Sequence, residues 1–112
     1  MHEDWPSVTA EAHQLVRGER GRLYDHPAID YGRTAAIFAA ITGIELSVPE
    51  AVTFMLAVKL SRIGAGLDHQ FPASAVRDSI VDLAGYADCL FGVWDVETSA
   101  DIDDAISELL DE

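Results

Sequence analysis

The sequence has one cysteine and no long apolar run, and these scarcities exclude several classes of protein. Cys89 cannot form a disulfide within the chain, which suits a reducing compartment, and its apolar neighbours predict a small core side chain. The apolar stretches without a charge, such as Ala51–Val58, are too short to span a membrane. Met1–Asp4 is acidic, so no export signal is predicted. We therefore expect a cytoplasmic protein without a membrane partner.

Basic residues are absent after Arg77, whereas acidic residues continue to the end of the sequence. The net charge of the 112 residues is −13. Residues 1–77 hold all seven basic residues and nine acids, and residues 78–112 hold eleven acids. Phosphate contacts need Lys and Arg, so we expect no direct nucleic-acid binding through this acidic third. A negative surface suits a basic protein partner instead.

No β-strand pattern or repeat is present, and the apolar spacing predicts one all-α domain over residues 1–112. A bundle of about four helices is expected over Val8–Arg20, Ala28–Thr42, Pro49–Ile63 and Ala75–Trp94. A short, separate, acidic amphipathic helix is expected within residues 95–112, and residues 1–6 are expected to be a mobile tail. The predicted N-caps of the helices are Ser7, Asp25 or His26, Ser47, Ser74 and Thr98, and the predicted helix ends are Gly43, Gly64 and Gly66.

The helix Pro49–Ile63 is apolar nearly all round, which predicts a place in the middle of the bundle. Its exceptions, Lys59 and Arg62, are three residues apart and share one face. Asp78 and Asp82 share a face of the next helix, and an antiparallel register places Lys59 between them. The sequence therefore predicts an ion cluster, which either fixes helix register or forms a polar site for an anion or a metal.

The stretch from Arg17 to Pro27 gathers polar side chains between turn-forming residues. It is either a solvated connector or a binding loop, and it clusters Arg17, Arg20 and Arg22 with Tyr24 and His26. If the first and central helices end at the same end of the bundle, Arg62 joins this loop in a basic pocket with Asp78 near its floor.

Three motifs resemble a family of small uncharacterised phage and bacterial domains. They are Gly18-Glu-Arg20 followed by Tyr24, His26-Pro27 and Tyr31; Lys59-Leu-Ser-Arg62; and Asp78-Ser-Ile-Val-Asp82-Leu-Ala-Gly-Tyr86. The match spans residues 17–88. It departs at Asp25, where Gly is usual, and at Asp30, where Asn is usual.

More distantly, the chain resembles the all-α nucleotide pyrophosphohydrolases of the MazG and dUTPase type. That resemblance implies oligomeric bundles that hold Mg²⁺ between two acidic helices. Here Lys59 and Arg62 stand in place of one acidic pair, so only Asp78 and Asp82 remain as metal ligands.

Two functions follow as hypotheses, and no catalytic residue is assigned. The first is a nucleotide-binding or phosphohydrolase module with ligand contacts from Arg17, Arg20, Tyr24, His26, Lys59, Arg62 and Tyr86 and with Mg²⁺ at Asp78 and Asp82. The second is an acidic interaction module that inhibits a host protein or mimics the charge of nucleic acid. In either case we expect a homodimer or larger homo-oligomer, because the apolar surface exceeds what a four-helix monomer needs.

Overall fold

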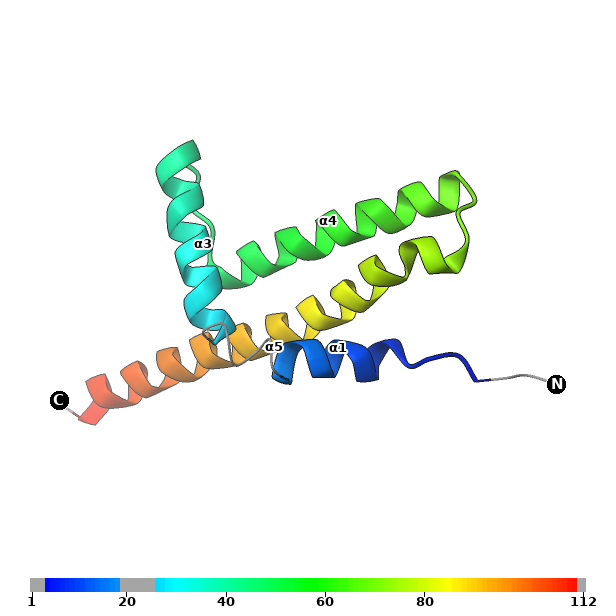
Figure 1. Ribbon diagram of the computed structural model, residues 1–112. Helices are drawn as coiled ribbons and strands as arrows, with labels where there is room; N and C mark the ends of the chain where they lie inside the picture. The colour runs from blue at the N-terminus through cyan, green and yellow to red at the C-terminus, as the bar shows by residue number, and fades with distance from the viewer. Residues whose placement is uncertain (1–3, 19–25, 111–112) are drawn as a thin grey trace.

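A computed structural model describes residues 4–18 and 26–110, except for the side chains of residues 100–106. This part of the chain contains four α-helices and no β-strand, which confirms the all-α prediction (Figure 1). The helices are α1 (Val8–Arg17), α3 (Pro27–Thr42), α4 (Val48–Asp68) and α5 (Ala73–Leu110). None of the described helices is long and apolar enough to cross a membrane.

The helices α4 and α5 form an antiparallel hairpin, and α1 lies along α5 (Figure 1). Glu11 pairs with Arg77 and Arg17 pairs with Asp88, so residue numbers rise together and α1 runs parallel to α5. The helix α1 is therefore antiparallel to α4. The helix α3 contacts both α4 and α5, and its C-terminal half extends past the start of α4 (Figure 1).

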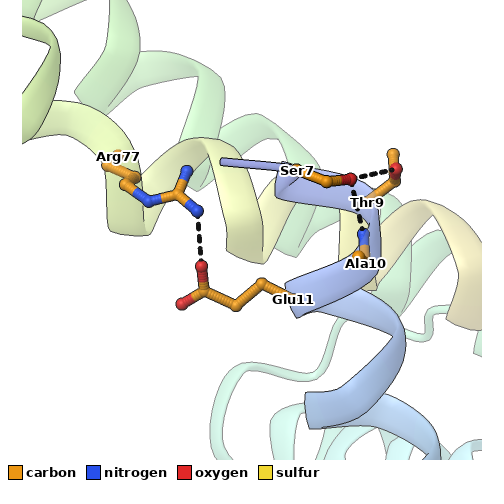
Figure 2. Close-up of polar contacts among 5 residues, drawn as sticks. All are labelled: Ser7, Thr9, Ala10, Glu11 and Arg77. Atoms are coloured by element: carbon orange, nitrogen blue, oxygen red, sulfur yellow. Dashed lines mark hydrogen bonds and ion pairs between the residues drawn. The ribbon is translucent and has the colours of Figure 1, made fainter. Parts of the chain in front are cut away.

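Two side chains stabilise the start of α1: Ser7 caps the helix, and Glu11 joins it to α5 (Figure 2). Ser7 is the N-cap, as predicted, and its Oγ accepts a hydrogen bond from the Ala10 N–H at 3.1 Å. One turn later, Glu11 Oε2 lies 2.6 Å from Arg77 Nη2 of α5 (Figure 2). The cap satisfies a backbone donor that the first turn leaves unpaired, and the ion pair sets the register of the two helices.

The predicted boundaries of α3 and the start of α4 are confirmed. His26 caps α3 by accepting from the Ala28 N–H. Gly43 ends α3 at φ 77°, a left-handed conformation that suits glycine. Ser47 and Glu50 form a capping box, and the Ser47 backbone N–H lowers the pKa of the Glu50 carboxylate by donating to it.

The predicted break at Gly64 and Gly66 is wrong, because α4 continues to Asp68. Gly66 is buried where the hairpin helices converge, and a Cβ there would collide with Val76 of α5. The glycine therefore permits close helix packing. The chain reverses after it through Gln70, whose φ is 54°.

The helix α5 is one continuous element of 38 residues, so the prediction of a separate C-terminal helix is wrong. The segment Asp95–Ser99 contains no glycine or proline that would end a helix, and the capping pattern at Thr98 lies inside it. Ser74 is likewise the second residue of α5, not its cap. Leu109 and Leu110 are exposed, so this end of α5 does not dock on its own bundle.

The buried core is small, and it lies along a different face of α5 from the apolar stripe that the sequence spacing predicts, namely Val76, Ile80, Leu83, Ala87, Leu90, Phe91 and Trp94. Val81 and Val93 of α5 are buried against the other helices, as is Val52 of α4. Phe91 and Trp94, both expected in the core, are 72% and 58% exposed. The central helix α4 is also not enclosed by its own chain, because its exposed residues include Phe54 and Leu60. Much of the apolar surface therefore stays uncovered within one chain.

Candidate functional site

A cavity of about 680 Å³ lies where the four described helices meet. Its apolar wall comes from α1 and α5, and includes Leu15, Val16 and Val81. Its polar side chains are Arg17, His26, Asp30, Tyr31, Lys59, Asp82, Tyr86, Asp88 and Cys89. This volume is in the range of small-molecule sites, roughly 300 to 1,000 Å³.

Lys59 is the buried charge at this site. Its Nζ lies 2.9 Å from Asp82 Oδ2, which confirms the predicted pairing of these two residues across the hairpin. The Lys59 side chain is 11% exposed and that of Asp82 is 34% exposed, so the carboxylate is the partner that reaches water. The pair places a fixed cation and a partly accessible anion on the cavity wall.

Arg17 and Asp88 form a second ion pair nearer to solvent. Arg17 Nε donates to Asp88 Oδ2 at 3.2 Å, and Arg17 Nη2 donates to Asp88 Oδ1 at 3.3 Å. The guanidinium therefore binds the carboxylate in a bidentate manner. The side chains are 60% and 40% exposed. An exposed pair contributes about 0 to 1 kcal/mol to stability, so Arg17 can exchange its partner at low cost.

Two tyrosines form the aromatic part of the site. Tyr31 of α3 and Tyr86 of α5 meet edge to face, with ring centroids 6.4 Å apart and planes at 76°. Burial raises the pKa of the Tyr31 hydroxyl far above its ordinary value, and the neighbouring Tyr86 adds to the shift. Tyr31 is therefore a neutral phenol at physiological pH, able to donate a hydrogen bond.

Cys89 completes the wall beside Asp88. Burial raises the pKa of its thiol, the Asp88 carboxylate raises it further, and Arg17 opposes the shift. The thiol is therefore mostly protonated at neutral pH, which makes it a slow nucleophile. Its place on the wall makes it a natural reporter of access to the cavity.

The cavity brings together four of the seven predicted ligand residues, namely Arg17, His26, Lys59 and Tyr86. Arg62 and Asp78 are exposed and do not line it. Arg20, Arg22 and Tyr24 lie outside the described residues. The predicted basic pocket requires the C-termini of α1 and α4 to lie at the same end of the bundle. They do not, because these two helices run antiparallel.

Sequence reasoning missed Asp30, Tyr31, Asp88 and Cys89 as site residues, although the spacing carried a signal. Asp82, Tyr86 and Cys89 follow one another at intervals of four and three, so they share one face of α5. Asp30 and Tyr31 lie one turn after the His26 cap, which brings them to the same cavity. The apolar stripe assigned to α5 was wrong by about one residue, and that error hid the polar face.

No group of three or more His, Cys, Asp or Glu side chains within the described part of the chain could hold a metal ion. Asp82 carries the Lys59 ion pair, and Asp78 is exposed outside the cavity. The Mg²⁺ site at Asp78 and Asp82 stays a prediction.

The four helices of the described part of the chain surround a polar cavity and define a small all-α domain. The chain belongs to the family described as "Domain of unknown function (DUF6378)", which matches residues 7–93. All the residues that line the cavity fall within that match, and the last turns of α5 lie beyond it.

Similar proteins occur in mycobacteriophages. The chain is 30% identical over 89 residues to the Gene 55 protein of Mycobacterium phage D29, covering 80% of this chain and 54% of the relative. It is 27% identical over 85 residues to the Gene 55 protein of Mycobacterium phage L5, covering 75% of this chain and 50% of the relative. The chain thus spans about half the length of these relatives. No solved structure is significantly similar to it.

Proposed function

We propose that the cavity binds a nucleotide-like anion, a phosphorylated molecule that carries a flat ring. The observation that carries the proposal is the cavity itself, which joins two cations, two tyrosines and an apolar wall in a volume that fits a nucleotide. Arg17 and Lys59 are the phosphate contacts, and the tyrosines with the apolar wall accept the ring.

The balance of charge favours a nucleotide that arrives with Mg²⁺. The cavity wall has two cations, Arg17 and Lys59, and three carboxylates, from Asp30, Asp82 and Asp88. A bare phosphate meets repulsion from those carboxylates, whereas Mg²⁺ bound to the phosphates turns the same carboxylates into favourable neighbours. This ion characteristically binds one or two carboxylates together with substrate phosphates.

His26 supplies a directional donor. Its Nδ1 accepts the Ala28 N–H, so the proton of the neutral imidazole is on Nε2. The α3 N-terminus, which lies beside it on the cavity wall, adds a favourable partial positive charge.

Cys89 allows a direct test, because it is the chain's single cysteine and it lines the cavity. We expect nucleoside triphosphates with Mg²⁺ to slow the alkylation of Cys89 and to raise the melting temperature. Arg17→Ala should weaken this protection about tenfold, the effect of losing roughly 1.4 kcal/mol of binding. Arg62→Ala is the matched control, since Arg62 lies outside the cavity.

The proposal fails if no nucleotide, with or without Mg²⁺, protects Cys89 or raises the melting temperature. It also fails if Arg62→Ala weakens protection as much as Arg17→Ala does. Hydrolysis is a separate step, tested by phosphate and pyrophosphate release in the same samples. Binding without release assigns a nucleotide-binding module.

A second candidate function, recognition of a basic protein, is favoured by the middle of α5, from Asp88 to Glu97. Phe91 and Trp94 are exposed there, with Asp88, Asp95 and Glu97 beside them. Apolar anchors surrounded by one sign of charge suit a partner of the opposite sign.

A further inference from the structure

The C-terminal half of α3 presents an apolar face that the rest of the described chain does not cover (Figure 1). Ile37 and Ile41, one turn apart, are 60% and 78% exposed, and Ile44 just after the helix is 55% exposed. Ala36 and Ala40 are exposed beside them. Ile37 and Ile41 are four residues apart and share one face of α3, and Ile44 follows the left-handed Gly43 that ends the helix. A contiguous apolar stripe of this kind marks an interaction surface.

The charge pattern decides what covers this stripe. The eleven residues Thr34–Ile44 include no charged residue, although the chain carries a net charge of −13. Two copies of such an acidic chain repel each other, so they associate best through a surface with no charge. The α3 stripe meets that requirement. The apolar residues Phe91 and Trp94 of α5 do not, since acids flank them.

The accessible area of the chain also fits a second copy. It is 8501 Å², whereas a compact monomer of 12.1 kDa exposes roughly 6,000 Å². The excess is about 2,500 Å² per chain, and obligate homodimers bury roughly 1,000 to 2,500 Å² on each partner. The chain as a whole therefore exposes enough surface for a stable dimer, and the α3 stripe is an uncharged part of that surface.

We propose that the chain forms a homodimer with two-fold symmetry in which α3 packs against α3 of a second copy. The interface is Ala36, Ile37, Ala40, Ile41 and Ile44 on both chains. The two alanines allow the helices to approach closely, and the isoleucines fill the grooves beside them, so the stripe is complementary to itself. This inference is independent of the proposed nucleotide site.

Light scattering at micromolar concentration tests the proposal with matched variants. The wild-type chain should have twice the 12.1 kDa mass, and Ile37→Asp/Ile41→Asp should be monomeric. Carboxylates buried at the interface should raise the Kd by about 100-fold or more. Phe91→Asp adds a charge at an equally exposed apolar position on α5 and should remain dimeric. A monomeric wild type, or a dimer that survives the α3 changes, overturns the proposal.

Cross-linking decides the matter if circular dichroism shows that the α3 variant has lost its helices. In a Cys89→Ser background, Ala40→Cys should give a covalent dimer with a short bis-maleimide. Thr9→Cys, on the exposed surface of α1, should stay monomeric. Failure of Ala40→Cys to cross-link, or equal cross-linking of both, overturns the proposal.

Discussion

Lys59 has a different energetic role from the other cations whose ion pairs are described above. It is the one buried charged residue among the described residues, with 9% of the residue's surface exposed. Arg17 and Arg77 form their ion pairs nearer to water. A buried cation without its carboxylate keeps the cost of desolvation and loses the compensating attraction. The stability of the hairpin therefore depends on Asp82 more than on Asp88.

Asp82→Ala should lower the free energy of unfolding by about 2 to 3 kcal/mol, below the usual 3 to 5 for a fully buried pair, because Asp82 is partly exposed. Asp88→Ala is the control and should cost under about 1 kcal/mol. Urea unfolding measures both. Lys59→Met/Asp82→Leu should recover most of the loss, since it removes both charges from the cavity wall. Equal effects of the two single changes would contradict the argument.

At the scale of elements, the glycines of α4 act in opposite ways. A Cβ added at Gly66 would collide with Val76 of α5, whereas a Cβ added at Gly64 would meet nothing within 4 Å. Gly66→Ala should destabilise the hairpin by about 1 to 3 kcal/mol through overpacking. Gly64→Ala should stabilise it by up to about 1 kcal/mol, because alanine has the higher helix propensity.

Thermal unfolding of the two glycine variants gives the sign of each change. Val76→Ala combined with Gly66→Ala should relieve the overpacking in part, which separates a local collision from a general loss of helix. If Gly66→Ala and Gly64→Ala shift the midpoint in the same direction, Gly66 has no packing role.

The sequence predicted those elements whose boundaries have a local cause. The Ser47–Glu50 capping box and the left-handed Gly43 were read correctly, because each depends on a few adjacent residues. The role of Gly66 was not, because it depends on Val76, which is ten residues away in sequence and on another helix. The continuity of α5 was also missed, since a capping pattern alone does not interrupt a helix.

The candidate site was predicted in part, for a related reason. Lys59 and Asp82 were paired correctly because an antiparallel hairpin fixes the register of two successive helices. The ion pair of Arg17 with Asp88 joins residues 71 apart, and helical spacing alone does not encode the direction in which α1 runs along α5. The expected meeting of α1 with the end of α4 was wrong for that reason.

At the scale of the whole molecule, the chain is elongated and its charge is uneven. Its extents are 66 × 35 × 24 Å, and its radius of gyration is 17.7 Å, against roughly 13 Å for a compact domain of this length. The exposed residues Trp94–Ser99 continue α5 past Val93, the last buried side chain among the described residues. This extension carries Asp95 and Glu97, so acidic side chains lie beyond the buried core.

If the middle of α5 recognises a basic partner, it should bind a basic amphipathic helical peptide, with affinity that falls as salt rises. Phe91→Ala/Trp94→Ala should weaken binding by about tenfold or more, because exposed aromatic residues act as anchors. Phe54→Ala/Leu60→Ala, at exposed apolar positions on α4, is the control. Peptide anisotropy measures both, and binding that is insensitive to the α5 change would show attraction by charge alone.

The two long-range ion pairs of α1 bear on the order in which the molecule assembles. Lys59 and Asp82 are 23 residues apart, whereas Arg17 and Asp88 are 71 apart. Closing the longer loop costs about 1 kcal/mol more free energy through lost chain entropy. This cost arises before the contacts that offset it can form. The α4–α5 hairpin is thus the natural nucleus, and α1 joins it afterwards. The cavity is consequently incomplete until α1 packs on α5, and a ligand bound there would act by holding α1 in place.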